Sequence, residues 1–120
     1  NSIEEKVQII NYVLTHSKEL RPSVTLKISI DGNLFEEHAQ GDGQYDAFMK
    51  ALEIIFKNNG KSLPQLKDYA VRIPPGGDTD ALCETIITWN NGVKEFITRG
   101  LDSDQTVSAI KATQKMLNLI

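Results

Sequence analysis

The sequence predicts an α+β fold, in which an N-terminal helix precedes two similar strand–strand–helix units, the second with an extra strand, that share one core. Three observations lead to this prediction. Apolar and polar residues alternate in several short segments, which is typical of half-buried strands. In other segments apolar residues recur every three or four positions, which is typical of amphipathic helices. Dipeptides ending in glycine separate neighbouring predicted strands and indicate tight turns.

The first predicted element is an amphipathic helix over residues 3–20. Ser2 and Glu5 match the capping-box pattern at its start, and Pro22 ends it. We expect residues 1–22 to form a linker or docking helix toward another domain, with packing on the chain's own domain as the alternative. The apolar residues spaced four, three and four positions apart are Ile3, Val7, Ile10 and Leu14.

Two strands and a helix follow and form the first predicted unit, residues 24–60. The tight turn Asp31-Gly32 joins the strand at 24–30 to a return strand at 34–40. A helix is predicted over 45–58. The alternating strand residues are Val24, Leu26, Ile28 and Ile30, and the helix face consists of Phe48, Ala51, Leu52 and Ile55.

The second predicted unit, residues 66–120, contains three strands and a final helix. Gly32 and Gly92 occupy turns in the two units, and Gly41 and Gly100 close the return strands, which indicates an internal repeat. The strands are predicted at 66–73, 82–89 and 93–99, with a loop at 74–78 and a turn at Asn91-Gly92. The helix has its seam at Val107, Ile110, Gln114 and Leu117, and Asp102, Ser103 and Asp104 are candidate N-caps.

The composition is that of one small globular domain. The chain has 120 residues, of which 40% are hydrophobic and 24% charged, and its formal net charge is −3. It can therefore bury enough apolar surface to fold without a disulfide or a metal ion. It has no basic patch, no apolar run that could span a bilayer and no signal peptide, so we expect no nucleic-acid partner and no membrane. Because it begins with Asn1, we expect a piece of a longer, cytoplasmic protein.

The sequence contains no pattern typical of a catalytic or metal site. The two histidines, His16 and His38, lack the spacing of metal ligands, and His16 is expected at the surface. The single cysteine, Cys83, has no candidate base nearby and is expected to be buried in a strand. We therefore expect no catalytic residue, no metal and no cofactor, and an independent small enzyme is a rival interpretation.

Two glycine-rich segments, residues 41–47 and 74–81, are the best candidates for binding. Glycines at the start of a helix leave backbone N–H groups accessible, and these groups suit a carboxylate. Asp46, in the first predicted turn of the helix, can accept hydrogen bonds from an ammonium group. Such a pair of charges suits a small zwitterion, although both segments can also be plain turns.

The order of several short motifs resembles the C-terminal regulatory domain of the α-isopropylmalate synthase and citramalate synthase family. The resemblance covers about residues 24–120. Its motifs are Gly41-Asp42-Gly43 with Tyr45-Asp46-Ala47-Phe48, then Leu66-x-Asp68-Tyr69, Gly77-Asp78-Thr79-Asp80-Ala81, and Gly100-x-Asp102-Ser103-Asp104.

The resemblance implies that residues 23–120 form a regulatory domain that dimerises and binds a branched-chain amino acid as feedback inhibitor. It also implies that acyl transfer belongs to a separate metal-dependent (β/α)₈ barrel of the same polypeptide. Gln44-Tyr45 stands where isopropylmalate synthases commonly have Pro-Val, and together with the loop at 73–77 it favours the citramalate synthase branch. We therefore expect isoleucine as the effector, with leucine as the alternative; a structural dimer module without a ligand is the rival interpretation.

The hypothesis for the effector site has three parts. Backbone N–H groups near Tyr45 and Asp46, or those near Thr79 and Ala81, bind the carboxylate. Asp46 and loop carbonyls bind the ammonium group. The aliphatic part of the amino acid is surrounded by four side chains, those of Tyr45, Leu66, Tyr69 and Ile73. The last three of these residues can equally be plain core residues.

Overall fold

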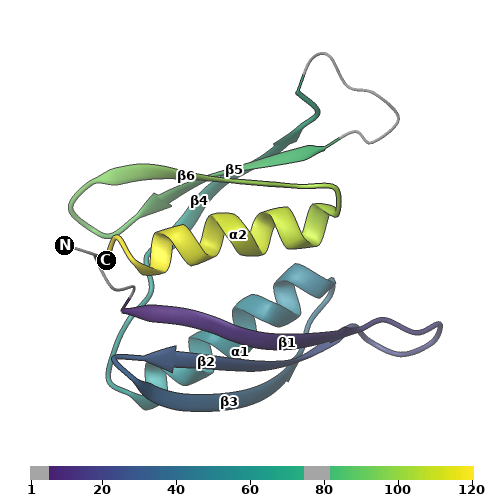
Figure 1. Ribbon diagram of the computed structural model, residues 1–120, viewed down its shortest axis with the longest axis horizontal. Coiled ribbons are helices and arrows are strands. Elements are labelled where there is room, and N and C mark those ends of the chain that lie inside the picture. Colours follow the sequence, from purple (N-terminus) through teal and green to yellow (C-terminus); the bar gives the residue numbers. More distant parts are fainter. Residues whose placement is uncertain (1–5, 75–81) are drawn as a thin grey trace. The chain divides into compact units, whose positions relative to one another are not determined.

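The computed structural model describes residues 6–74 and 82–120. The chain divides into two compact units, unit 1 (Asn1–Leu63) and unit 2 (Pro64–Ile120). Each unit has a three-stranded antiparallel sheet and one helix that packs against it, which confirms the predicted α+β class (Figure 1). The elements are β1 (Val7–Thr15), β2 (Ser23–Ile30), β3 (Asn33–Gln40) and α1 (Gln44–Asn58) in unit 1, and β4 (Gln65–Arg72), β5 (Cys83–Asn90), β6 (Glu95–Asp102) and α2 (Gln105–Leu117) in unit 2.

The predicted N-terminal helix over residues 3–20 is wrong in its described part, where the chain forms strand β1. This strand pairs antiparallel with β2, so residues 7–15 belong to unit 1 and are not a docking helix. A bulge between Ile9 and Asn11 makes Ile10 an extra residue, 47% exposed, and interrupts the alternation. The interrupted alternation has apolar residues three and four positions apart and therefore imitates a helix, while the many β-branched residues favour a strand.

The core of unit 1 lies between the central strand β2 and α1. Val24, Leu26 and Ile28 of β2 are completely buried, as their alternation predicts. The predicted turn is confirmed, because Asp31 and Gly32 both have positive φ, at 50° and 85°. The residues that α1 buries are Ala47, Phe48, Ala51, Leu52, Ile55 and Phe56.

Unit 2 has the same arrangement around β5 and α2, but a more polar interior. The buried polar side chains among the described residues, Thr85, Thr98, Ser108 and Thr113, all lie in this unit. Thr85 Oγ1 and Ser108 Oγ are 2.5 Å apart, and the Trp89 indole N–H donates to Thr98 Oγ1 at 2.8 Å. Within the described ranges no buried side-chain N or O atom lacks a hydrogen-bond partner, so this polarity is compatible with a stable core.

The repeat is more complete than predicted, because both units read strand–strand–strand–helix. The first strand of each unit even carries a bulge at the same place, between Ile9 and Asn11 in β1 and between Leu66 and Asp68 in β4. The shared core that we expect for the two units stays a prediction. Neither helix in the described part of the chain is long and apolar enough to cross a membrane.

Candidate functional site

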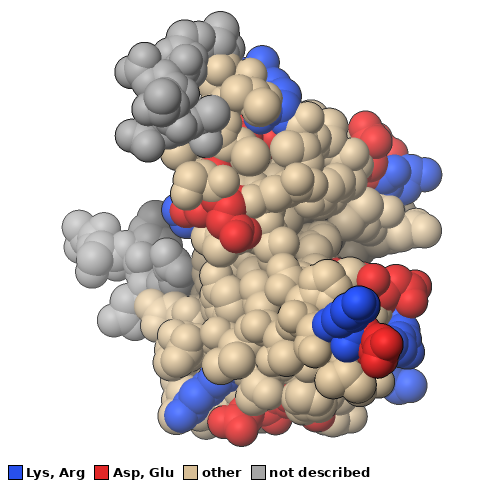
Figure 2. Space-filling model, turned by 90° about the vertical axis from the view of Figure 1, so that its right-hand side faces the viewer, with Lys and Arg blue, Asp and Glu red and all other residues tan. Residues whose placement is uncertain are grey.

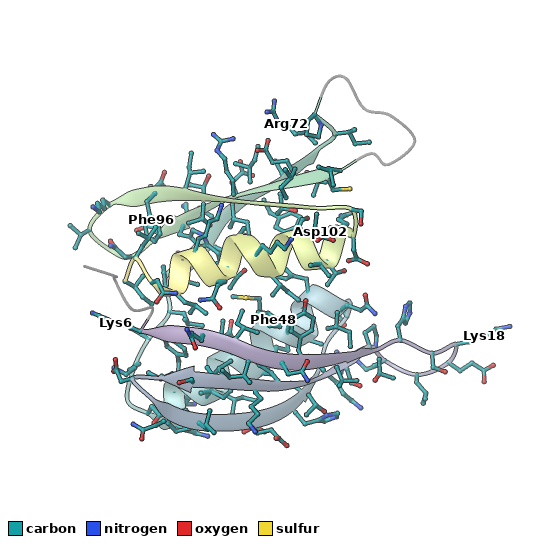
Figure 3. All side chains as sticks on the ribbon, viewed as in Figure 1. Lys6, Lys18, Phe48, Arg72, Phe96 and Asp102 are labelled. Carbon is teal, nitrogen blue, oxygen red and sulfur yellow. The ribbon has the colours of Figure 1, made fainter. Side chains whose placement is uncertain are left out.

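Tyr45, the first of the predicted site residues, lies in the first turn of α1 as part of an aromatic cluster. Its ring stacks on Phe48, with the centroids 6.2 Å apart and the planes 13° apart. Phe48, labelled in Figure 3, also meets Tyr12 of β1 edge to face at 6.1 Å. Phe48 is completely buried, so this cluster attaches α1 to the first strand of its sheet.

Asp46, the second predicted residue, stabilises the start of α1. The backbone N–H of Asp42 donates to its Oδ2 at 2.8 Å, and Lys50 Nζ, one turn further along the helix, donates to the same oxygen at 3.1 Å. The hydrogen bond from Asp42 and then the one from Lys50 lower the pKa of Asp46. The N-cap residue Gly43 makes no side-chain hydrogen bond, and the Asp46 carboxylate instead fixes the loop before α1 to the first turn of the helix.

Gly41 has a geometric reason to be glycine. A Cβ at this position would overlap the backbone N of Ala47 and would lie 2.7 Å from Asp46 Oδ2. The motif Gly41-Asp42-Gly43 therefore permits the chain to approach the beginning of α1 closely, and this approach accompanies the hydrogen bond between Asp42 and Asp46.

Leu66 and Tyr69 lie on β4 in unit 2, on the face of the sheet that α2 covers over β5 and β6. They pair with Trp89 and Ile87, both completely buried, yet Leu66 is 37% exposed and Tyr69 is half-buried. Val71 lies on the same face opposite Thr85 and is 36% exposed. The first strand of unit 2 thus leaves a partly uncovered apolar strip, which we define as Leu66, Tyr69 and Val71.

The remaining predicted residues are placed as follows. Ile73 lies just beyond the end of β4 and is 66% exposed. Thr79 and Ala81 lie outside the described residues. Sequence reasoning did not single out Val71, although its alternation with Tyr69 and Ile73 indicates that it lies on the same face of the strand. Tyr45 and Asp46 belong to unit 1, whereas Leu66, Tyr69 and Ile73 belong to unit 2.

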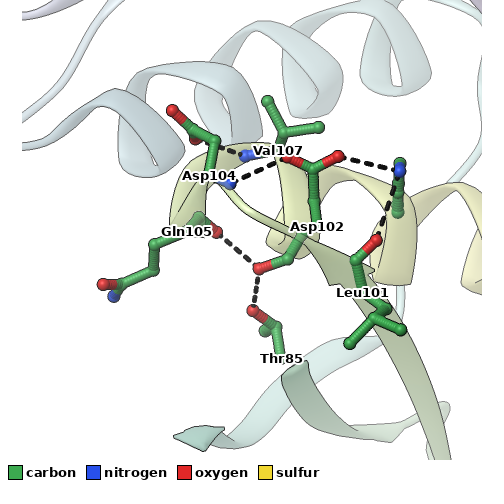
Figure 4. A network of polar contacts seen from close by, with 8 residues as sticks. Thr85, Leu101, Asp102, Asp104, Gln105 and Val107 are labelled. Atoms are coloured by element: carbon green, nitrogen blue, oxygen red, sulfur yellow. Dashed lines mark hydrogen bonds and ion pairs between the residues drawn. The ribbon is translucent and has the colours of Figure 1, made fainter. Parts of the chain in front are cut away.

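The start of α2 contains a second carboxylate network, shown in Figure 4. The candidate Asp104 is confirmed as the N-cap, since its side chain accepts the backbone N–H of Val107 at 2.9 Å. Asp102 accepts the backbone N–H of Asp104 at 2.8 Å and Lys111 Nζ at 2.9 Å. The backbone hydrogen bond from Asp104 and then the one from Lys111 lower the pKa of Asp102.

Lys50 and Lys111 occupy the same position, the seventh residue of their helices. In each unit this lysine binds a carboxylate that also accepts a backbone N–H from the preceding loop. The carboxylate comes from the helix in unit 1 and from the end of β6 in unit 2, so the two units reach the same contact by different residues.

His38 and Cys83 lie on strands β3 and β5. His38 Nδ1 is 3.0 Å from Thr25 Oγ1, and Cys83 is half-buried at the first position of β5 instead of being buried as predicted. No group of His, Cys, Asp and Glu in residues 6–74 and 82–120 could hold a metal ion. On the face that Figure 2 shows, charges of both signs form small mixed groups.

An open groove of about 460 Å³ lies in unit 1 between β3 and the solvent-facing side of α1. It contains none of the predicted site residues. The residues that line it are Ala39, Gln40, Lys50, Glu53, Ile54 and Lys57.

Comparison with known proteins identifies the family. The family model described as LeuA allosteric (dimerisation) domain matches residues 1–120. The chain is 34% identical over 94 residues to a 2-isopropylmalate synthase of Methylorubrum populi (78% of this chain, 17% of that protein). It is 28% identical over 118 residues to a 2-isopropylmalate synthase of Aquifex aeolicus (95% and 21%). It is 27% identical over 117 residues to a putative (R)-citramalate synthase of Archaeoglobus fulgidus (98% and 23%).

The chain therefore spans only 17% to 23% of the length of these relatives. The family model nevertheless covers it from end to end, which agrees with the resemblance of its glycine and aspartate motifs. The repeated strand–strand–strand–helix chain described here belongs to the LeuA allosteric (dimerisation) domain family.

Proposed function

We propose that this chain is the regulatory part of an acyltransferase of the isopropylmalate and citramalate synthase type, and that it binds a branched-chain amino acid as feedback effector. The match of the allosteric domain family to residues 1–120 carries this proposal. Acyl transfer would belong to a metal-dependent barrel elsewhere in a longer, cytoplasmic polypeptide, in keeping with the short share of the relatives that the chain spans.

Isoleucine is the proposed effector, with leucine as the second candidate. The Gln44-Tyr45 sequence and the loop at 73–77 favour the citramalate synthase branch, and one curated relative bears that name. An apolar pocket discriminates between two such isomers through shape alone, typically by about 1–3 kcal/mol. The preference between isoleucine and leucine is therefore to be measured directly.

In unit 2 we propose that Leu66, Tyr69 and Ile73 surround the aliphatic side chain of the effector. The exposure of these apolar residues supports this role, because side chains that only filled the core of unit 2 would be buried like Ile87 and Trp89. Backbone N–H groups near Thr79 and Ala81 are the proposed donors to the effector carboxylate.

In unit 1 we propose that Asp46 and the adjacent Tyr45 take part in binding, with the Asp46 carboxylate as acceptor for an ammonium group. Both hydrogen bonds described above are accepted by Oδ2 of Asp46, and neither of them uses Oδ1. This carboxylate is ionised at neutral pH, as such a role requires, and the hydrogen bonds that lower its pKa extend the charged form to more acidic pH.

Isothermal titration calorimetry with isoleucine, leucine and valine tests the proposal. We expect heat of binding and a raised melting temperature with isoleucine, because a ligand that binds only the folded state stabilises it by about 2.7 kcal/mol at a hundredfold excess over Kd. Alanine is the matched control, since it has the same charges without the branched part of the side chain. If none of the three amino acids binds at millimolar concentration, the chain is a structural dimer module instead.

A further inference from the structure

A buried chain of hydrogen bonds joins the central strand of unit 2 to the start of α2 (Figure 4). Ser108 Oγ donates to the Gln105 backbone O at 2.7 Å, and Thr85 Oγ1 lies 2.5 Å from Ser108 Oγ. Because Ser108 gives its one hydroxyl hydrogen to Gln105, Thr85 is the donor in the second contact. Thr85 and Ser108 are both completely buried. We define the hydroxyl relay as Thr85, Ser108 and the Gln105 carbonyl.

The hydroxyl relay lies where α2 touches the backbone of its sheet. Gly100 of β6 pairs with Thr85, and a Cβ at Gly100 would overlap the backbone O of Ser108. Ser108 therefore meets β5 through its hydroxyl and β6 through its backbone. On the other side of β5, Thr85 pairs with Val71 of the β4 strip. A displacement of β4 or β5 would therefore act directly on the first turn of α2.

Unit 1 shows what the same place looks like without hydroxyl groups. The two helices begin 61 positions apart, and the same spacing relates the residue pairs of β2 and β3 to those of β5 and β6. Val24 thus corresponds to Thr85, and Ala47 corresponds to Ser108. All four residues are completely buried. Valine has the shape of threonine without its hydroxyl, so the hydroxyl relay is not needed to fill this space.

The hydroxyl relay contributes position rather than stability. Replacing both partners of a buried hydrogen bond by apolar groups of the same shape is nearly neutral or even stabilising. A hydrogen bond, unlike an apolar contact, depends steeply on distance and direction, and it is electrostatically stronger in a buried site than in water. The relay therefore specifies one position of α2 on its sheet.

We infer that Thr85 and Ser108 are positioning residues that couple β4 and β5 to the start of α2, so that a ligand held by β4 orders the first turn of this helix. The inference rests on the proposed function, in which Leu66 and Tyr69 of β4 surround the aliphatic part of the effector. It adds the route by which binding reaches α2. Unit 1 has apolar residues at the two positions and does not share this coupling.

The test compares two identical substitutions in the full chain, Thr85→Val and Thr113→Val. Thr113 is also completely buried, but its hydroxyl donates to the Ala109 backbone O within α2, at 2.8 Å, so its loss leaves the hydroxyl relay intact. Hydrogen–deuterium exchange reports on residues 103–110. In the free chain Thr85→Val should speed this exchange about fivefold or more, because local opening of the helix start becomes easier. Thr113→Val should change it by less than about twofold.

The same measurement with bound isoleucine, or leucine if it binds more tightly, separates coupling from simple stability. Isoleucine should slow the exchange of residues 103–110 in the parent and in Thr113→Val, but not in Thr85→Val. The affinity of Thr85→Val, measured by calorimetry, should stay within about threefold of the parent, since the closed state that binds remains the dominant one. A role of Thr85 in stability alone would not remove the effect of the ligand on this segment.

Circular dichroism shows whether each variant is folded. If Thr85→Val does not fold, the double variant Thr85→Val, Ser108→Ala copies the residues of unit 1 and carries the same expectations. If the parent binds none of isoleucine, leucine and valine, the proposed function fails, and exchange in the free chain still tests the hydroxyl relay. If the parent binds but the ligand slows exchange of residues 103–110 equally in the folded relay variant, or not at all in the parent, the inference is wrong and the proposed function stands.

Discussion

Single residues at the starts of the two helices combine charge with backbone hydrogen bonding. Asp46 and Asp102 each accept one backbone N–H from the loop and one lysine ammonium. Such carboxylates stabilise a helix start because they complement the unpaired N–H groups of its first turn. Any function of these residues in binding must therefore be separated from their contribution to folding.

Replacing Asp46 by Ala should lower the free energy of unfolding by about 0.3–1 kcal/mol, because α1 loses a negative charge near its N-terminus. Urea denaturation measures this change. If Asp46 also holds the ammonium group of isoleucine, affinity should fall on the order of 10–150-fold. Asp46→Asn is the matched control, since it keeps an acceptor for Asp42 without the charge. Unchanged affinity in a folded Asp46→Ala variant would contradict the proposed contact.

The same carboxylates predict how stability depends on pH. The pKa values of Asp46 and Asp102 are lowered from the ordinary 3.8 in the folded chain. Their stabilisation is therefore fully present above the pKa of the unfolded chain, and it is lost as the pH falls through the lower folded values. Denaturation between pH 6 and pH 2.5 should show a decline that is shallower in an Asp46→Asn, Asp102→Asn double variant. An equally steep decline would assign the acid sensitivity to other groups.

At the scale of the elements, the sequence pattern predicts a helix where the structure has strand β1. Substitutions of two neighbouring isoleucines test the strand assignment. Ile9 is half-buried opposite Ile28, whereas Ile10 is the exposed bulge residue. Ile9→Ala should cost roughly 1–2 kcal/mol, less than a fully buried isoleucine, and Ile10→Ala about 0.5 kcal/mol or less. Chemical denaturation of both variants measures the change in the free energy of unfolding that each substitution causes. A larger cost at Ile10 would favour a helix with Ile10 on its apolar face.

The contact between β6 and α2 depends on Gly100. A Cβ at this position would overlap the backbone O of Ser108 and would lie 2.7 Å from the backbone N of Ala112. Because backbone atoms cannot move aside cheaply, Gly100→Ala should destabilise the chain by about 1–3 kcal/mol or more. Gly43→Ser is the control, since a Cβ at Gly43 meets nothing within 4 Å and serine is a good N-cap. Equal melting temperatures for Gly100→Ala and the parent would refute this explanation of Gly100.

At the scale of the whole molecule, we expect a homodimer, as the description of the matched family as a dimerisation domain suggests. Sedimentation velocity at tens of micromolar, with and without isoleucine, should give the mass of two chains. A monomer under both conditions would contradict the expectation. An effect of isoleucine on the dimerisation constant would show that binding and association are coupled, since such coupling is reciprocal.

Most of the fold followed from local patterns. The strands after residue 22, both helices and the turn at Asp31-Gly32 agree with the sequence predictions, because alternation, helical spacing and positive φ are properties of neighbouring residues. The repeat was recognisable from its glycines for the same reason. The N-terminal segment was misassigned because a bulge belongs to a pair of strands, and the partner strand lies in another part of the chain.

For the candidate site, too, some features followed from the sequence and others only from the tertiary structure. The sequence alone determined the family motifs and predicted the candidate site residues, which are Tyr45, Asp46, Leu66, Tyr69, Ile73, Thr79 and Ala81. Only the tertiary structure decided that the half-buried Tyr45 ring stacks on the buried Phe48 and that the β4 strip is partly uncovered. Burial depends on which side chains of a distant helix reach a strand, and this follows from packing in three dimensions rather than from the order of residues.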